Sequence, residues 1–134
     1  MVARPASAVR RAKRGRLSRS AEFDRVFRQG RSLANRVLVL YSFPRGAGEP
    51  AEAPRLGLSV SRKVGGAVDR NRVKRLLREA FEAECARVPA GYDVVLVARP
   101  EAREVAERDG LAGVRAALTE LLDRMRERGG DETP

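Results

Sequence analysis

The sequence contains no histidine, no tryptophan and a single cysteine, Cys85. One thiol has no partner for an intrachain disulfide, and without histidine the Cys/His zinc sites and all histidine-based catalytic arrangements are excluded. We therefore expect Cys85 to be a small core residue.

Long apolar runs are missing as well. The chain has no stretch long and apolar enough to span a membrane, no signal-type apolar segment and no lipidation motif. We therefore expect a cytoplasmic protein that does not associate with membranes. Its 134 residues suffice for one domain that buries roughly two-thirds of its unfolded surface.

Positive charge is abundant and unevenly distributed. The 28 Lys and Arg outnumber the 18 Asp and Glu, for a net charge of +10. Residues 1–78 contain 20 of these cations and 5 acids, whereas residues 79–134 contain 8 and 13. A GC-rich coding sequence would favour Arg over Lys, but it would not cluster the cations. The first part of the chain is expected to bind an anion, and nucleic acid fits better than a membrane surface.

The densest basic stretch runs from Arg70 to Phe81 and carries a helical apolar pattern. Apolar residues recur at spacings of three and four, which places them on one buried stripe: Val73, Leu76, Leu77, Ala80 and Phe81. The cations project from the other sides. Residues 65–69 are expected to form a flexible turn before the helix. The cations then lie at a helix N-terminus, where the macrodipole favours anions, and a nearby phosphate backbone would resolve that conflict.

The remaining pattern predicts an α/β (α+β) sandwich with one mixed sheet of about four strands, three helices and the order α-β-β-α-β-α. We expect residues 1–15 to be a basic flexible arm, residues 16–128 one domain, and residues 129–134 a disordered tail. The expected helices are 21–29, 70–81 and 111–125, the last ending before Gly129; the expected strands are 36–43, 55–61 and 92–99. An acidic connector covers residues 101–110.

Two features of this pattern have two interpretations each. Phe23 and Phe27 form an apolar stripe with Val26 on the first helix, so they are either core residues or rings on which bases stack. Ser59 and Ser61 lie on the polar face of the second strand, which is either solvent-exposed or the floor of a groove for a single strand. Tyr41, on the strand expected beside it, could supply a stacking ring to such a groove.

Residues 70–81, with Gly57 to Gly65 before them, closely resemble the sequence motif of the bacterial ribonuclease P protein component. The resemblance extends over about residues 16–125. It implies a small α/β protein that binds the catalytic RNA of ribonuclease P and helps it to recognise precursor tRNA. It also implies a left-handed βαβ crossover, opposite to the general rule.

The resemblance also implies a role for each of the following residues. Those expected to face the catalytic RNA are Arg70, Asn71, Arg72, Lys74, Arg75 and Arg78. Those expected to line a cleft for the 5′ leader are Phe23, Phe27, Tyr41, Ser59 and Ser61. Those expected to contact phosphates of either RNA are Arg16, Arg36, Arg62 and Lys63. On this basis we expect the exposed edges of Phe23 and Phe27 to contact nucleotides, while the rest of each ring serves the core.

Neither a catalytic residue nor a protein metal site is expected, because the acids are dispersed and metal-dependent hydrolysis requires clustered carboxylates. The resemblance implies Mg²⁺ held mainly by the RNA, and no obligate protein partner. One alternative is a general RNA-binding or ribosome-associated protein with the same basic face and no role in tRNA processing. The other is a self-sufficient nuclease, against which the lack of histidine weighs.

Overall fold

A four-stranded mixed sheet forms the centre of the computed structural model, which describes residues 20–44, 54–89 and 91–132. The strands are β1 (Arg31–Ala34), β2 (Leu38–Pro44), β3 (Arg55–Val60) and β4 (Tyr92–Ala98), in the spatial order β1-β2-β4-β3. The β1–β2 and β2–β4 pairs are antiparallel, and the β3–β4 pair is parallel. β4 lies inside the sheet and its side chains are covered on both faces, as its apolar run predicts.

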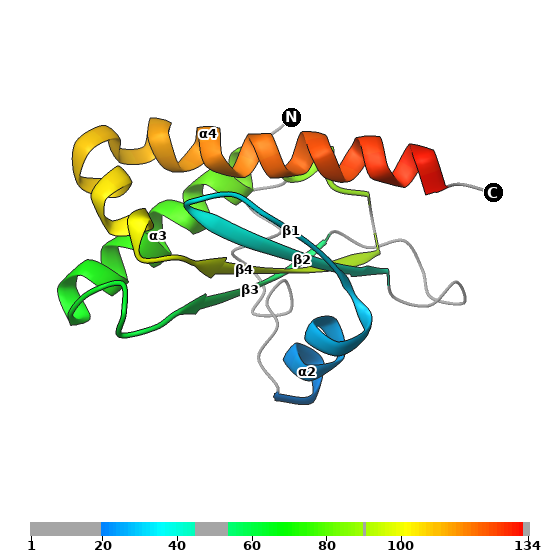
Figure 1. Ribbon diagram of the computed structural model, residues 1–134, viewed down its shortest axis with the longest axis horizontal. Coiled ribbons are helices and arrows are strands. Elements are labelled where there is room, and N and C mark those ends of the chain that lie inside the picture. The colour runs from blue at the N-terminus through cyan, green and yellow to red at the C-terminus, as the bar shows by residue number, and fades with distance from the viewer. Residues whose placement is uncertain (1–19, 45–53, 90, 133–134) are drawn as a thin grey trace.

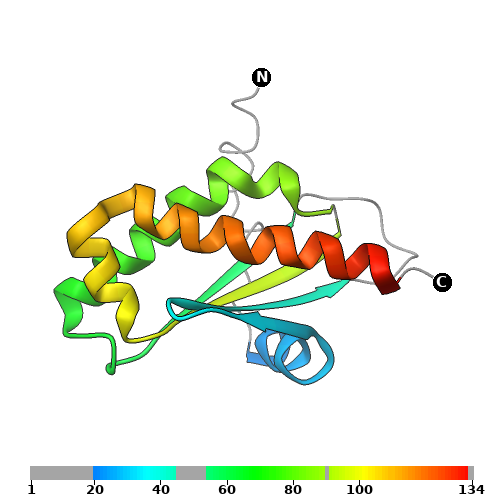
Figure 2. The same ribbon diagram turned by 45° about the horizontal axis from the view of Figure 1, so that its top comes forward.

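Helices cover the two faces of the sheet unequally (Figures 1 and 2). α3 (Ala67–Glu84) and α4 (Glu101–Glu132) lie on one face, whereas the short α2 (Ser20–Gln29) lies on the other. The main core is on the α3/α4 side and includes Leu40, Leu77, Phe81 and Leu96. A smaller core forms where Val26 of α2 meets Val95 of β4. The predicted fold class, a mixed sheet of four strands with three helices, is confirmed.

The predicted element order lacked β1, whose four residues pair with β2 from Arg31↔Ser42 to Ala34↔Val39. Only Leu33 of β1 is buried, so the segment has almost no apolar signal of its own. The turn after it is fixed by Asn35, whose Oδ1 accepts hydrogen bonds from the backbone N–H groups of Val37 (3.0 Å) and Leu38 (2.8 Å). The strand arises from this Asn-centred turn and from pairing, rather than from its own sequence pattern.

β3 and β4 are connected by α3 and the short 3₁₀ helix η2 (Cys85–Arg87), which makes the parallel crossover. The left-handedness of this βαβ crossover stays a prediction. Because β4 lies between β2 and β3, the expectation that Tyr41 is on the strand beside Ser59 is wrong. Both residues nonetheless face the α2 side of the sheet, since Tyr41 pairs with Val95 and Ser59 with Val97.

Besides shifts of one to three residues at the start of α2 and the end of α3, the helix boundaries differ from the predicted ones at three places. α3 begins at Ala67, with Gly66 as its N-cap, so residues 67–69 are helical rather than part of a turn. The acidic connector is also helical, because Ala102 and Ala106 form a buried stripe four residues apart. Gly110 bends α4 between its two segments with a left-handed φ of 62°.

The C-terminal end of α4 is the third difference. The helix continues past Gly129 to Glu132, whereas the sequence predicted an end before that glycine and a disordered tail from residue 129. Glycine lowers helix propensity by about 1 kcal/mol relative to alanine, but it keeps its N–H donor, so it weakens a helix without stopping it. The predicted basic arm, residues 1–15, and most of the predicted loop at 44–54 lie outside the described residues.

Candidate nucleic-acid interface

The basic helix is attached to the core by one side and exposes cations on the others. Val73, Leu77, Ala80 and Phe81 are buried against the core, and Leu76 is half-buried beside them, as the spacing predicted. Among the residues expected to face RNA, Asn71, Arg72 and Arg75 are exposed, and Arg70, Lys74 and Arg78 are half-buried. One helix therefore brings all six to one surface, which we call the basic side of α3.

The cations of this surface differ in how they are paired. Within the described part of the chain, Arg72, Lys74 and Arg75 form no ion pair with a carboxylate. Arg70 has a buried Nε without a hydrogen-bond partner among the described residues. Buried polar atoms are normally hydrogen-bonded, so the described residues leave this bonding capacity of Arg70 unused.

The helix N-terminus is less unfavourable for cations than the sequence suggested. Asp69 lies in the first turn, where a negative charge interacts well with the helix dipole. Its carboxylate lies 3.7 Å from the guanidinium of Arg103 on α4. The negative charge of Asp69 therefore offsets part of the positive end of the helix dipole, and Arg103 of α4 partly neutralises Asp69.

The turn between β3 and α3 carries three of the predicted contacts. Ser61, Arg62 and Lys63 are all exposed. The Ser61 hydroxyl accepts a hydrogen bond from the Lys63 backbone N–H at 3.2 Å, and its carbonyl accepts one from Val64 at 3.0 Å. The structure thus places Ser61 in this turn, beyond the end of β3. It lies next to Arg62 and Lys63, and it stabilises the turn that presents both of them.

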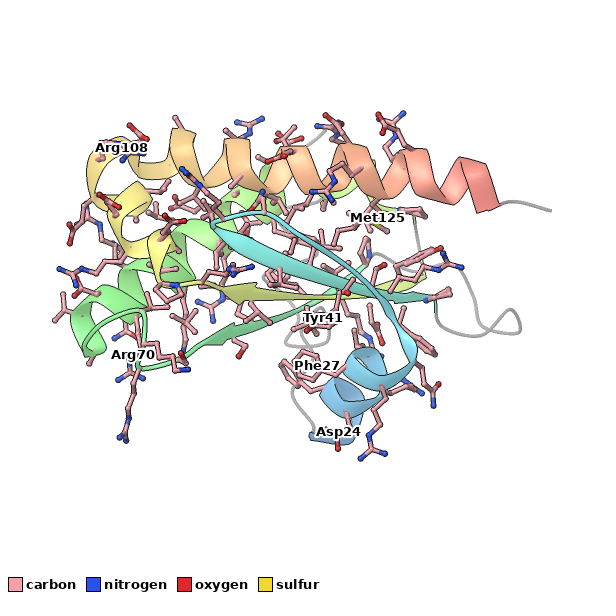
Figure 3. The ribbon with its side chains drawn as sticks, in the orientation of Figure 1. Asp24, Phe27, Tyr41, Arg70, Arg108 and Met125 are labelled. Atoms are coloured by element: carbon pink, nitrogen blue, oxygen red, sulfur yellow. The ribbon has the colours of Figure 1, made fainter. Side chains whose placement is uncertain are left out.

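The aromatic residues predicted for a leader cleft do meet. The rings of Phe23 and Phe27 have centroids 6.2 Å apart, and Phe27 contacts Tyr41 edge-to-face at 4.8 Å. Phe27 is 39% exposed, while Phe23 and Tyr41 are half-buried. We call these three residues the aromatic patch. Figure 3 shows Phe27 and Tyr41 between α2 and the sheet, apart from Arg70 at the N-terminal end of α3.

Ser59 lies on the same sheet face as the aromatic patch but on a different strand. Tyr41, Val95 and Gly57 form one cross-strand row, and Val39, Val97 and Ser59 form the next. Ser59 is therefore two strands away from Tyr41, which corresponds to roughly 10 Å. That distance suits a nucleotide chain whose bases reach the rings while its backbone passes the half-buried serine.

Two other predicted phosphate contacts are placed differently. Arg36 lies in the β1–β2 turn and is highly exposed, with its Nε 3.7 Å from the carboxylate of Glu101. It belongs to neither the basic side of α3 nor the aromatic patch. Arg16 lies outside the described residues.

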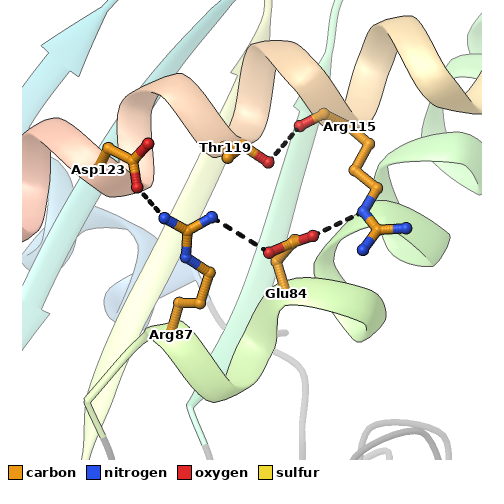
Figure 4. Close-up of polar contacts among 5 residues, drawn as sticks. All are labelled: Glu84, Arg87, Arg115, Thr119 and Asp123. Carbon is orange, nitrogen blue, oxygen red and sulfur yellow. Dashed lines mark hydrogen bonds and ion pairs between the residues drawn. The ribbon is translucent and has the colours of Figure 1, made fainter.

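The sequence analysis missed a cluster of paired charges between α3 and α4 (Figure 4). Glu84 accepts hydrogen bonds from Arg115 Nε (2.6 Å) and Arg87 Nη1 (3.4 Å), and Arg87 also pairs with Asp123. Burial raises the pKa of Glu84, but the hydrogen bonds and charges of Arg115 and Arg87 outweigh this, so the pKa is lowered overall. We call Glu84, Arg87, Arg115 and Asp123 the α3–α4 clasp.

Cys85, next to the clasp, is buried as predicted. Burial raises the pKa of its thiol, which keeps it protonated and unreactive at neutral pH. A second missed feature is Asp93, a fully buried acid at the start of β4 that pairs with Arg55 and Arg25. The available signal was a single charge within an otherwise apolar central strand.

No helix in the described ranges combines the length and apolar character needed to cross a bilayer.

Comparisons with known proteins agree on one family. The family model described as "Ribonuclease P" matches residues 12–126. The ribonuclease P protein component of Clostridium novyi is 38% identical over 112 residues, covering 84% of this chain and 94% of that protein. The solved structure of the Staphylococcus aureus RNase P protein is similar with a TM-score of 0.72 at 32% identity, covering 84% of this chain and 95% of that one. The Thermotoga maritima RNase P protein gives a TM-score of 0.71 at 36% identity, covering 83% and 97%.

Proposed function

Since the chain belongs to the ribonuclease P protein family, we propose that it is the protein subunit of a ribonuclease P ribonucleoprotein. In this role it binds the catalytic RNA and the 5′ leader of precursor tRNA. It thereby assists the endonucleolytic cut that gives the mature tRNA 5′ end. The observation that carries the proposal is the basic side of α3, where Arg72, Lys74 and Arg75 have no carboxylate partner in the described part of the chain.

We assign the basic side of α3 to the catalytic RNA. Arg72 and Arg75 lie on a firmly anchored helix and suit phosphate contacts, because no ion pair with the described residues has to be broken on binding. Half-buried Arg70 adds a further positive charge beside them. Arg62 and Lys63, which are exposed in the turn before the helix, extend the same positive surface.

We assign the aromatic patch and Ser59 to the leader. Phe27 exposes part of its ring while Tyr41 and Phe23 hold it from two sides. Stacking of a base on an aromatic ring contributes about 1–3 kcal/mol and does not depend on the base, so the patch can accept leaders of different sequence.

We propose that the active site is in the RNA. Asp93, whose side chain is fully buried, and Glu84, whose side chain is 11% exposed, are each engaged by two arginines, so their oxygens are not available as magnesium ligands. Among the residues the structure describes, acidic and cysteine side chains form no group of three suited to a metal ion. The donors present do not fit a resident metal site, and we assign the catalytic Mg²⁺ of the holoenzyme mainly to the RNA.

The remaining parts of the proposal concern setting and partners. We place the protein in the cytoplasm, where precursor tRNA is processed, with the RNA subunit and precursor tRNA as its partners. No obligate protein partner is needed for either surface, because the basic side of α3 and the aromatic patch are both built by one chain.

Reconstitution tests the proposal. The catalytic RNA alone and the RNA with this protein are compared for cleavage of precursor tRNA across a magnesium series. We expect the protein to restore cleavage at magnesium concentrations where the RNA alone is inactive. Absence of rescue would contradict the proposal and favour a general RNA-binding protein. Cleavage by the protein without RNA would instead indicate a self-sufficient nuclease.

A further inference from the structure

Asp93 is an acidic residue in the central strand of the sheet, and its side chain is 0% exposed. Arg55, opposite it in the parallel β3–β4 pair, donates from Nε to Oδ1 at 2.8 Å and from Nη2 to Oδ2 at 2.9 Å. Such a bidentate contact fixes the direction of both side chains. The Arg55 side chain is itself only 20% exposed, so the ion pair is a rigid part of the sheet surface.

Arg25 connects this pair to α2. Its Nη2 lies 3.8 Å from Oδ2 of Asp93, and its guanidinium carbon lies 5.3 Å from the ring centroid of Phe43. Phe43 is opposite Asp93 in β2, so Phe43, Asp93 and Arg55 form one cross-strand row. Arg25 rests on this row with one charge contact and one cation–π contact. We call the four residues the Asp93 row.

Arg25 and Phe27 leave α2 on opposite flanks. Successive helical residues are about 100° apart, so with Val26 directed onto Val95, its two neighbours point to either side. On one flank Arg25 contacts the Asp93 row; on the other Phe27 contacts Tyr41 at 4.8 Å. The helix is therefore held on both sides of a central contact, and rotation about that contact would move the Phe27 ring.

A contribution to the free energy of unfolding is a poor explanation for the buried ion pair of the Asp93 row. A buried ion pair seldom stabilises a fold more than apolar residues of similar size would, whereas it does restrict geometry. We propose that the Asp93 row positions α2 for leader recognition, with Arg25 as the positioning residue that holds Phe27 at its place beside Tyr41. This inference rests on the proposed function.

The first test uses the free protein and needs no RNA. NMR contacts between the ring protons of Phe27 and Tyr41 are compared in wild type, Arg25→Ala and Arg28→Ala. Arg28 is an exposed arginine on the same helix, so its loss controls for charge and helix propensity. We expect the ring contact to weaken in Arg25→Ala alone. An unchanged contact would overturn the inference whatever the holoenzyme does.

The second test is a double-mutant cycle in the holoenzyme. Affinity is measured for a precursor tRNA with a long leader and for a matched tRNA without one, using Arg25→Ala, Phe27→Ala and the double variant. We expect Arg25→Ala to weaken long-leader binding by about three- to tenfold, with no further loss on the Phe27→Ala background. Equal losses on both backgrounds would show direct contact of Arg25 with RNA and overturn the positioning role.

Asp93→Asn provides a second variant with the same shape and no charge. We expect it to weaken long-leader binding in the same direction, again only when Phe27 is present, while circular dichroism shows a folded protein. Failure of the proposed function is distinguishable from failure of this inference. If the wild-type holoenzyme bound the long-leader precursor and the leaderless tRNA equally, the proposed leader site would be contradicted. If the effects of Arg25→Ala and Phe27→Ala were additive, only the positioning role of the Asp93 row would be contradicted.

Discussion

The basic side of α3 and the α3–α4 clasp use the same residue type in opposite ways. In the first half of α3, Arg72 and Arg75 are exposed and have no carboxylate partner in the described ranges. Glu84, the last residue of the same helix, pairs with Arg87 of η2 and with Arg115 of α4, and Arg87 also pairs with Asp123. The start of α3 thus carries arginines that we assign to an external partner, whereas its last residue is held by arginines of η2 and α4 that stabilise the fold.

We infer from this difference that pairing, rather than the number of cations, marks the proposed binding surface. An arginine with an internal carboxylate has to lose that contact before it binds phosphate, whereas an unpaired one does not. The charge difference between residues 1–78 and 79–134 has the same basis, because the acids needed for internal pairing are concentrated in the second part. Variants can therefore separate the two roles.

The largest effect is expected for Arg72→Ala combined with Arg75→Ala. Each change removes a charged donor that we assign to the catalytic RNA, and we expect the RNA affinity to fall by about 10- to 100-fold. With five to seven phosphate contacts, the wild-type log–log salt slope should be about −4 to −6, and the double variant should be less steep by about 1.5–2. Filter binding across a salt series measures both quantities.

Arg115→Ala is the matched control, because it removes the same charge from the α3–α4 clasp. We expect it to leave the RNA affinity and the salt slope nearly unchanged. Equal losses of RNA affinity for Arg115→Ala and for the α3 double variant would contradict the distinction between arginines with and without a carboxylate partner among the described residues. A wild-type slope near −1 would contradict the assignment of the basic side of α3 as a phosphate-binding surface.

The next largest effect is expected for Phe27→Ala, which sharpens the comparison by adding an uncharged surface. Loss of one stacking ring should weaken binding of a long-leader precursor by about tenfold, since base stacking contributes about 1–3 kcal/mol. Affinity for the catalytic RNA and its salt dependence should not change. If Phe27→Ala and the α3 double variant had identical effects on binding of the catalytic RNA and of the long-leader precursor, the assignment of two separate surfaces to these two ligands would be wrong.

A smaller effect, on stability alone, is expected for Glu84→Gln. The Glu84 side chain is 11% exposed and accepts from two guanidinium groups, so removal of its charge leaves both arginines with weaker partners. We expect unfolding free energy at pH 7 to fall by about 1–2 kcal/mol in urea denaturation. RNA affinity should stay within twofold of wild type. A loss of RNA affinity with unchanged stability would reverse the roles assigned to the two ends of α3.

Periodicity and family resemblance were sufficient for the fold class, the buried stripe of α3 and the central position of β4. Each of these depends on side chains that repeat along one element. β1 could not be predicted in the same way, because it depends on the Asn35 turn and on pairing with β2. The helical start of α4 was missed because its buried residues are alanines, which give a weak apolar signal.

The candidate site was only partly predictable for a similar reason. Arg72, Arg75 and Phe27 lie within short motifs, so their helical faces follow from spacing. Arg25 and Asp93 are 68 positions apart in sequence and meet only because α2 lies across β4. Contacts of this kind depend on tertiary packing, and no local pattern along the chain indicates them.

The smallest expected effect is the pH dependence of the α3–α4 clasp. Because the pKa of Glu84 is lowered in the folded protein, the unfolded chain takes up this proton at higher pH than the folded protein does, and the carboxylate stabilises the fold while it is ionised. That stability is fully present above about pH 4.3 and is lost as the pH falls through the lower folded pKa. Urea denaturation of wild type and Glu84→Gln at pH 7, 5.5, 4 and 3 isolates the contribution of the Glu84 carboxylate to stability, since other carboxylates titrate in both proteins.

We expect the difference in unfolding free energy between the two proteins to be constant from pH 7 to 5.5 and to shrink below pH 4. A difference that persisted unchanged at pH 3 would show that the clasp stabilises the fold through packing rather than through the Glu84 charge.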